Sequence, residues 1–398
     1  MDQGGEQAGK RRNVYVFGAT SFFNDTATEM AYWILPAFLA SIGAGPAQLG
    51  IIEGMAESVA SMGKLWSGLL TDRLTRRKPL VVFGYTLANV LKPVLAVATS
   101  WWHVLLIRFG DRTSKGIRGA PRDVMLSESV PRERVGSAFG LLQAMDSAGA
   151  IAGPLAALLI VTHYGFRGVF WAAAVPGLLS IAIVTVGARE TGKPHPHAAT
   201  KTRSPALPLS GHFYFMLAAV TLFSLGNSSD MFLVLRAQEV GIAARYAPLL
   251  GLVFNVTYTA ASWPAGHLSD RVSRHALAAA GYAVFAIVYG VLAAAPSRAA
   301  LWAMMSFYGL YYALTSPVLR ALVVDQVPPG SRGRAFGIFY FTTSIATLIS
   351  SIATGELWKH FGARLPFSIS AALAVMAAIM LLAGSRKTPE DDRIQVPD

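Results

Sequence analysis

Cysteine is absent from this 398-residue sequence, and charged residues make up only 14% of it. Without cysteine the chain has no disulfide bond, thiolate metal site or thiol nucleophile. The shortage of charge excludes an ordinary soluble globular domain, in which about a quarter of the residues are charged. Hydrophobic residues account for 53% of the chain. These proportions predict an all-α protein that crosses a membrane many times.

Motifs of enzymes and of ATP-driven pumps are also missing. The sequence has no His-Glu-x-x-His zinc motif, no phosphate-binding P-loop and no Gly-x-Ser-x-Gly nucleophile motif. Methionines within apolar segments, such as Met55 and Met62, are better explained by ordinary packing than by copper binding. We therefore expect no enzyme activity, no cofactor and no metal site.

Apolar segments recur along the chain at the length of a membrane-spanning helix. A bilayer core about 30 Å thick needs roughly 20 apolar residues per helix. Twelve spans are predicted on this basis, at residues 14–41, 47–70, 79–99, 102–125, 134–161, 167–187, 211–237, 246–269, 275–295, 299–325, 333–359 and 363–384. The Pro, His, Lys and Arg content of 188–210 indicates a linker between two six-helix domains, 14–187 and 211–384.

The net charge of +12 falls largely in short loops between the predicted spans. Short loops rich in Lys and Arg stay in the cytoplasm, which predicts an inner-membrane protein with cytoplasmic tails at 1–13 and 385–398. Nucleic-acid binding is not expected, because such proteins gather basic residues on a solvated face. Anionic lipid is the simpler partner. We expect a monomer in the lipid bilayer.

Short motifs of the first half recur in the second half. The loop after the second span holds Gly68, Asp72, Arg73 and Arg76, and a shift of 198 superposes them on Gly266, Asp270, Arg271 and Arg274. A shift of 197 superposes VPRERVGSAFG at 130–140 on VPPGSRGRAFG at 327–337. The chain is therefore predicted to be an internal duplication of six spans.

The loop pattern Gly-x-Leu-x-Asp-Arg-x-x-Arg resembles the loop between helices 2 and 3 of the major facilitator superfamily, where it is read as a conformational latch. The resemblance implies two six-helix bundles related by a pseudo-twofold axis along the membrane normal. It also implies a secondary transporter that works by alternating access. Asp72 would pair with Arg73, Arg76 or Arg134, or lie near the positive N-terminus of a following helix. Such contacts would favour the state in which the cytoplasmic side is shut.

The fifth span carries a second family-like pattern. It resembles the antiporter motif Gly-x8-Gly-x3-Gly-Pro-x-x-Gly-Gly at Gly140, Gly149, Gly153 and Pro154. Ala157 and Leu158 replace the last two glycines. The resemblance implies export coupled to protons, whereas small residues at this spacing also pack membrane helices closely without any such role.

Carboxylates lie in the middle of several spans, where a charge costs about 2.5–3.5 kcal/mol. Glu53 and Glu57 share one face of the second span, and Arg108, Arg112 and Lys115 form a stripe on the fourth. The segment from Arg112 to Ala120 resembles the family motif Arg-x-x-Gln-Gly-x-x-x-Ala, which is associated with proton coupling, with Lys115 in place of the Gln. Adjacent carboxylates cannot both ionise cheaply, so one binds a proton near neutral pH. The predicted proton-coupling residues are Asp25, Glu29, Glu57, Asp146, Arg112 and Lys115. The alternative is a set of ion pairs that hold the first half together and never titrate.

The spans of the second half hold few ionisable residues, and their polar content comes mainly from amides and tyrosines. A tyrosine offers an apolar ring and a hydroxyl group, which suits the wall of a ligand site. The predicted substrate-cavity residues are Asn227, Asp230, Asn255, Tyr258, Tyr308, Tyr311 and Tyr312. Ordinary packing is the alternative for each tyrosine.

With the family resemblance, these features favour export of a small organic solute in exchange for protons. Uptake of a small solute or metal chelate is the second hypothesis. A transporter-like receptor that binds its ligand without net flux is the third.

Overall fold

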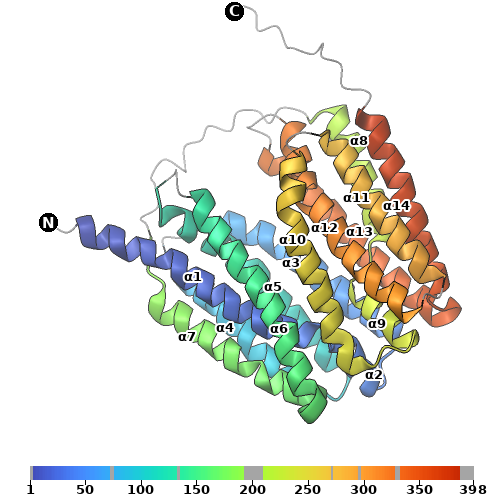
Figure 1. Ribbon diagram of the computed structural model, residues 1–398. Helices are drawn as coiled ribbons and strands as arrows, with labels where there is room; N and C mark the ends of the chain where they lie inside the picture. Colours follow the sequence, from blue (N-terminus) through green and yellow to red (C-terminus); the bar gives the residue numbers. More distant parts are fainter. Residues whose placement is uncertain are drawn as a thin grey trace, which may run out of the picture.

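The computed structural model describes residues 3–71, 76–131, 135–191, 209–269, 272–294, 297–327 and 332–385. The first bundle contains α1 (Gln3–Tyr32), α2 (Leu35–Ser41), α3 (Pro46–Thr71), α4 (Lys78–Val94), η1 (Leu95–Val97), α5 (Trp101–Glu128), α6 (Val135–Ala172) and α7 (Ala174–Gly187). The second contains α8 (Gly211–Gly226), α9 (Met231–Glu239), η4 (Ala244–Tyr246), α10 (Ala247–Ser269), α11 (Arg274–Ala293), α12 (Arg298–Asp325), α13 (Arg332–Phe361) and α14 (Arg364–Ser385). Figure 1 shows the two bundles side by side.

These helices form twelve spans, because α1 continues into α2, α4 into η1 and α8 into α9. The helix α6 covers the predicted fifth span and the start of the sixth, with a backbone turn at Gly165 (φ 64°), and α7 completes the sixth. Six of the described segments are long and apolar enough to cross a membrane, and α1, α3 and α5, which carry charged residues along their length, are not among them. The predicted all-α fold with twelve spans is confirmed.

Two spans that were predicted as single helices are interrupted. The first breaks at Trp33 and Ile34, where α2 begins with a proline in its first turn; proline removes a backbone donor and clashes with the preceding turn. The seventh breaks between Gly226 and Met231. The intervening Asn-Ser-Ser-Asp side chains compete for backbone hydrogen bonds and so favour such a break. The predicted continuous helix 211–237 is wrong at this point.

The duplication is visible in the backbone. The positive-φ glycines among the described residues are Gly43 and Gly241, 198 residues apart, and Gly165 and Gly362, 197 residues apart. Only glycine adopts this conformation without strain. Ser100 and Ser297, also 197 apart, cap the first turns of α5 and α12. Equivalent turns in the two bundles therefore have equivalent geometry.

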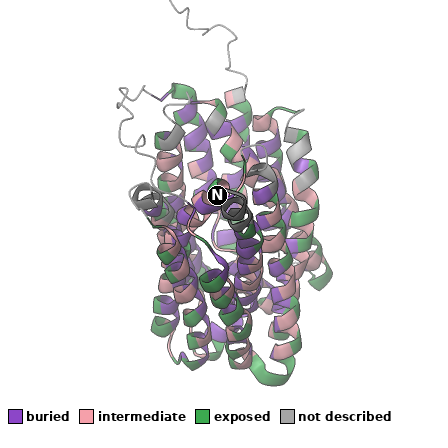
Figure 2. Cartoon of the chain, turned by 90° about the vertical axis from the view of Figure 1, so that its left-hand side faces the viewer, coloured by how far each residue is buried: buried purple, intermediate pink, exposed green. Residues whose placement is uncertain are grey.

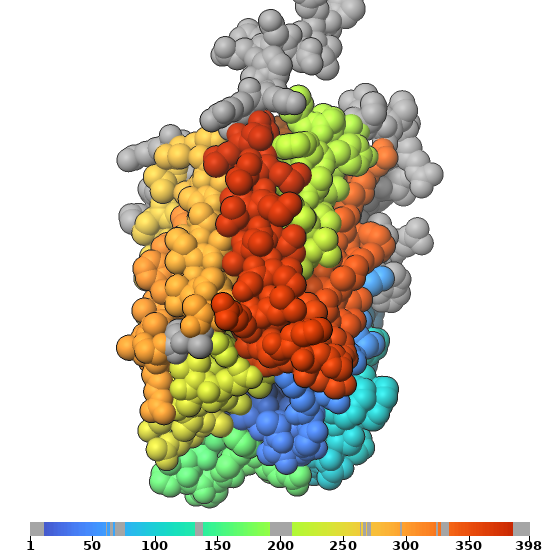
Figure 3. Space-filling view, turned by 90° about the vertical axis from the view of Figure 1, so that its right-hand side faces the viewer, coloured from blue at the N-terminus to red at the C-terminus, as the bar shows by residue number. Residues whose placement is uncertain are grey.

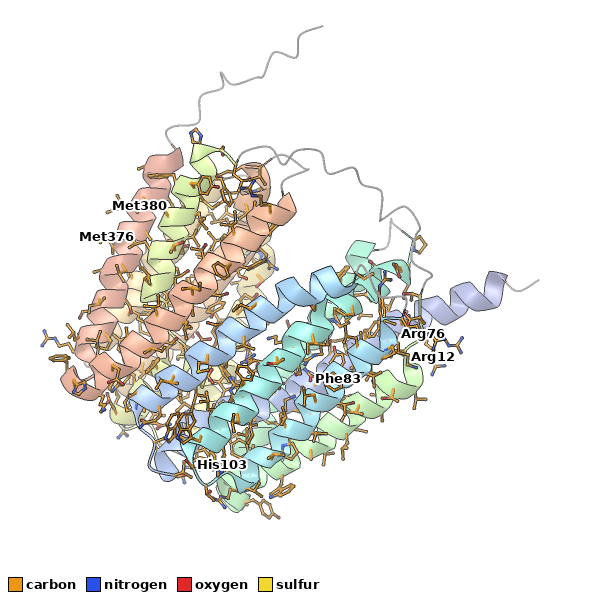
Figure 4. The ribbon with its side chains drawn as sticks, turned by 180° about the vertical axis from the view of Figure 1, so that it is seen from behind. Arg12, Arg76, Phe83, His103, Met376 and Met380 are labelled. Carbon is orange, nitrogen blue, oxygen red and sulfur yellow. The ribbon has the colours of Figure 1, made fainter. Side chains whose placement is uncertain are left out.

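The outward faces of the bundles are apolar. Leu159, Val186 and Ile379 have exposed fractions of 71%, 80% and 61%, and Figure 2 shows exposed positions along the sides of the helices. In Figure 3, α14 lies between α8 and α11 on one such face. Met376 points outward from α14 and Phe83 from α4 (Figure 4). So much exposed apolar surface fits contact with lipid rather than water.

The bundles contact each other from the middle of the helices to the end that carries α2 and α9. Hydrogen bonds between them join Ser58 to the Ser344 carbonyl (3.1 Å) and Asn255 to the Ala150 carbonyl (3.1 Å). The ring of Trp33 packs on Gly251 of α10. Figure 1 shows α2 and α9 close together at the lower end. The structure thus records a state in which the two bundles meet at this end.

Candidate functional site

A polar cavity of about 200 Å³ lies between the two bundles. Residues of α1, α3, α12, α13 and the α8–α9 break line it: Tyr32, Glu53, Glu57, Asn227, Ser228, Ser229, Asp230, Tyr312, Thr347 and Ser351. Three of these residues are acids, and they come from both bundles. Among the predicted site residues, the lining includes Glu57, Asn227, Asp230 and Tyr312.

The acids of α3 lie against the basic residues of α5. Arg108 donates to Glu53 through Nε (2.9 Å) and Nη2 (2.7 Å), and both side chains are buried. Glu57 and Arg112 lie one turn farther along the same two helices. Glu57 follows Glu53 by four residues on α3, and Arg112 follows Arg108 by four residues on α5. Each helix therefore presents its two charged residues on one face. The Ser229 hydroxyl also lies 3.5 Å from Glu53 and links this pair to the second bundle.

A chain of buried polar contacts runs from Arg108 into the first bundle. Arg108 Nη1 lies 3.7 Å from Asp111 Oδ2, and Asp111 Oδ1 lies 3.9 Å from Lys92 Nζ. Lys92 also donates to Asn89 (2.9 Å) and Asn24 (3.4 Å). Each buried charge therefore has partners that offset its desolvation. The sequence prediction missed Lys92 and Asp111, although both stand inside predicted spans, where the cost of a charge would have singled them out.

Three of the predicted proton-coupling acids lie in the region where α1 and α6 pack together. Asn24 donates to Asp25 (2.9 Å), and the Trp33 indole donates to Glu29 (2.7 Å). Asp146 Oδ1 is buried and has no hydrogen-bond partner among the described residues. These acids do not belong to the lining of the cavity.

The predicted basic stripe on α5 divides into two environments. Arg112 is buried, with its guanidinium carbon 5.8 Å from the centroid of the Tyr32 ring. Lys115 is exposed. Arg112 is thus the member of this pair that lies near the cavity wall.

Close packing of α1 on α6 depends on two glycines of the fifth-span motif. A Cβ atom at Gly149 would lie 3.1 Å from Asp25 Cβ, and one at Gly153 would lie 2.7 Å from Glu29 Cβ and from the Thr26 carbonyl. A Cβ atom at Gly140 meets nothing within 4 Å. Pro154 lies within α6 directly after Gly153. Gly149 and Gly153 therefore hold the segment with Asp25 and Glu29 against α6.

Replacement of Gly153 by alanine is expected to destabilise this contact by about 1–3 kcal/mol, the usual effect of overpacking. The new methyl group would meet backbone of α1, which cannot rotate away. Thermal unfolding of the purified protein measures the loss. Gly140→Ala on the same helix is the matched control, because it makes the same gain in helix propensity without the clash and should unfold no lower than the wild type. Equal midpoints for both variants would contradict the packing role of Gly153.

The α8–α9 break places Asp230 at the cavity. Its carboxylate accepts hydrogen bonds from Tyr308 (2.6 Å) and Tyr312 (3.2 Å) of α12. Asn227 Oδ1 and Ser228 Oγ are buried and have no hydrogen-bond partner among the described residues. The break thus concentrates polar atoms at one wall of the cavity.

The other predicted cavity residues lie behind this wall or away from it. Tyr311 is buried and accepts a hydrogen bond from Asn227 (3.4 Å). Tyr258 packs edge-on against Tyr312 at 6.0 Å between ring centroids. Asn255 bonds the α6 backbone and belongs to the contact between the bundles.

Most of the predicted latch lies outside the described residues: Asp72, Arg73, Asp270 and Arg271, together with the side-chain surroundings of Gly68 and Gly266. At the same end, Arg77 pairs with Glu128 (2.8 Å) and Arg274 pairs with Asp325 (2.5 Å). These pairs are related by a shift of 197, so Arg77 and not Arg76 is the structural equivalent of Arg274. Arg76 is exposed at this end, near Arg12 and opposite to His103 (Figure 4).

Comparison with known proteins agrees with the duplicated helical fold. A family model described as the Major Facilitator Superfamily matches residues 17–236 and again residues 215–397. An uncharacterized MFS-type transporter of Methanocaldococcus jannaschii is 33% identical over 380 residues, which cover 93% of this chain and 94% of the relative. A multi-drug resistance efflux pump of Streptococcus pneumoniae is 23% identical, covering 85% of this chain and 88% of the pump.

Solved transporter structures share the arrangement of helices. A bacterial homolog of the human lysosomal transporter Spinster, in an inward-facing and unoccupied conformation, has a TM-score of 0.76 at 14% identity and covers 97% of this chain and 98% of its own. The nucleoside transporter NupG has a TM-score of 0.73 at 13% identity, with 94% and 100% covered. At these identities the likeness concerns the fold alone.

Proposed function

Because the chain belongs to the major facilitator superfamily, we propose that it exports a small organic solute across the inner membrane in exchange for protons. The observation that carries this proposal is the polar cavity between the two bundles. The contacts described between the bundles run from the middle of the helices to the end with α2 and α9. A solute bound there reaches the other side when the bundles rock and meet at the opposite end. The basic loops support a cytoplasmic position for the end with Arg76 and Arg77, and in that orientation the recorded state faces inward.

The export direction is supported by relatives rather than by geometry. The relative from S. pneumoniae is named as an efflux pump, and a relative from Enterobacter lignolyticus, 22% identical over 95% of this chain, is named as a multidrug resistance protein. Uptake of a small solute or a metal chelate is the second candidate, because the same alternating cavity serves either direction. In cells that lack the protein, accumulated compound rises if the protein exports it and falls if the protein imports it. A receptor changes neither.

Coupling to protons is supported by the contacts of Glu29. Its carboxylate accepts the Trp33 indole hydrogen bond at 2.7 Å, and the Trp33 ring packs on Gly251 of the second bundle. A change in the charge of Glu29 therefore acts on a side chain that forms part of the contact between the bundles. Asp25 and Asp146 lie on the same side of the first bundle and extend this acidic region.

Asp25→Asn and Glu29→Gln are each expected to abolish the dependence of transport on the pH gradient. Both changes keep the shape of the side chain and an acceptor oxygen but remove the group that binds a proton. Transport in proteoliposomes with an imposed pH gradient measures the effect, and the control is Glu356→Gln, at an acid near the end of α13 whose side chain is about half exposed. If both variants keep the wild-type pH dependence, neither acid carries the proton.

A further inference from the structure

Asp230 differs from the other two acids of the cavity in its partners. Glu53 is held by Arg108 at 2.7 Å, and Glu57 and Arg112 occupy the equivalent positions one turn along the same two helices. Among the ion pairs of the described residues, none includes Asp230. Its hydrogen-bond partners are the neutral hydroxyl groups of Tyr308 and Tyr312. The described partners of Asp230 are therefore hydroxyl groups, whereas Glu53 has an arginine beside it.

Other atoms at the α8–α9 break also favour a positive charge. The helix α8 ends at Gly226, so its last carbonyl groups and the negative end of its dipole lie at the break. Asn227 Oδ1 and Ser228 Oγ are buried without partners among the described residues, and both residues line the cavity. These oxygens can accept hydrogen bonds from a ligand that carries N–H groups. A ligand with an anionic group would instead be repelled by the Asp230 carboxylate.

Aromatic rings complete the environment. Tyr312 donates to Asp230 and lines the cavity, and its ring packs on Phe254 at 5.2 Å between centroids. Tyr32 lines the cavity from the first bundle. A carboxylate beside tyrosine rings is the combination that recognises an ammonium group attached to an apolar body, through charge, hydrogen bonds and cation–π attraction.

We propose that the cavity binds an organic ammonium ion, with its charged nitrogen beside Asp230 at the α8–α9 break and its apolar body against Tyr312 and Tyr32. This inference rests on the proposed function, since it names the solute class of the same cavity. The cavity of about 200 Å³ encloses the charged head and the adjoining part of such a solute, because pockets for whole drug-sized ligands measure about 300–1,000 Å³.

The test compares three ligands of one shape on the purified protein: 4-phenylbutylamine, which is cationic at pH 7, the neutral 4-phenylbutan-1-ol and the anionic 4-phenylbutyrate. Binding is measured by calorimetry and by the shift of the thermal midpoint. We expect the amine to bind the wild-type protein at least about tenfold more tightly than the alcohol, which corresponds to about 1.4 kcal/mol, and the anion not to bind. Asp230→Asn should remove this preference, whereas Glu356→Gln should keep it.

Asparagine retains an acceptor for the two tyrosine hydroxyls, so Asp230→Asn is expected to fold. If it does not, the comparison of amine and alcohol on the wild-type protein still decides. Equal binding of the amine and the alcohol would overturn the proposal, and so would full amine binding by Asp230→Asn. A thermal shift caused by NaCl but not by the amine would also overturn it. The measurement needs no membrane gradient. Amine binding without pH-coupled flux would therefore refute the proposed function and leave this inference standing, and flux without a preference for cations would do the reverse.

Discussion

Arg108→Met is expected to lower the free energy of unfolding by about 3–5 kcal/mol, the usual effect of leaving one member of a buried ion pair without its partner. Glu53 is 4% exposed and would lose three hydrogen bonds of 2.7–3.0 Å, keeping only the Ser229 hydroxyl at 3.5 Å. Asp111 would lose less, because Lys92 remains 3.9 Å away. Unfolding of the purified protein, followed by helical circular dichroism, measures the change.

A double-mutant cycle separates the lost ion pair from lost packing. Methionine fills part of the space of the arginine stem, and Glu53→Gln removes the stranded charge. The variant with both changes is therefore expected to regain a large part of the stability. The exposed pair of Glu356 and His360 provides the control, since Glu356→Gln should change stability by less than about 1 kcal/mol. Wild-type stability of Arg108→Met would show that Glu53 does not depend on this partner.

Much of the fold follows from the sequence because lipid imposes simple rules on it. Apolar length, basic loops and the recurring motifs of residues 68–76 and 266–274 together predict twelve spans in two halves. The same rules miss local interruptions. The break at Asn227 to Asp230 has no proline. Its four polar residues also leave the mean hydropathy of the whole segment high enough to predict a span. Only the competition of short polar side chains for the backbone indicates such a break.

The site was less predictable, because contacts between bundles join residues with no relation in sequence. The approach of Ser229 to Glu53, 176 positions apart, depends on how two separate helix surfaces meet. By contrast, the pairing of α3 acids with α5 bases follows from equal spacing on two neighbouring helices. Lys92 was missed for another reason. It lies in an otherwise apolar span, and its partner Asp111 lies within the basic stripe of α5, so neither formed a recognisable motif.

Gly50→Leu is expected to shift the protein out of the recorded state and to abolish transport while the fold is kept. Gly50 of α3 lies against the Ser351 carbonyl of α13, and a Cβ atom there would lie 3.1 Å from the Ser351 carbonyl carbon and 3.4 Å from Gly355 Cα. This contact joins the two bundles, which must part here in the opposite state. Overpacking by about 1–3 kcal/mol changes a two-state ratio roughly 5- to 150-fold.

The absence of cysteine makes this shift directly measurable. Ser41→Cys and Arg245→Cys, both exposed at the end where the bundles meet, accept one spin label in each bundle. Electron–electron resonance should record longer label distances in Gly50→Leu than in the parent. Gly290→Leu on α11 is the matched control, because a Cβ atom there meets nothing within 4 Å, and its distances and transport should equal those of the parent. Unchanged distances in Gly50→Leu would mean that the α3–α13 contact is compatible with both states, and the alternation would then require a different pair of helices to separate.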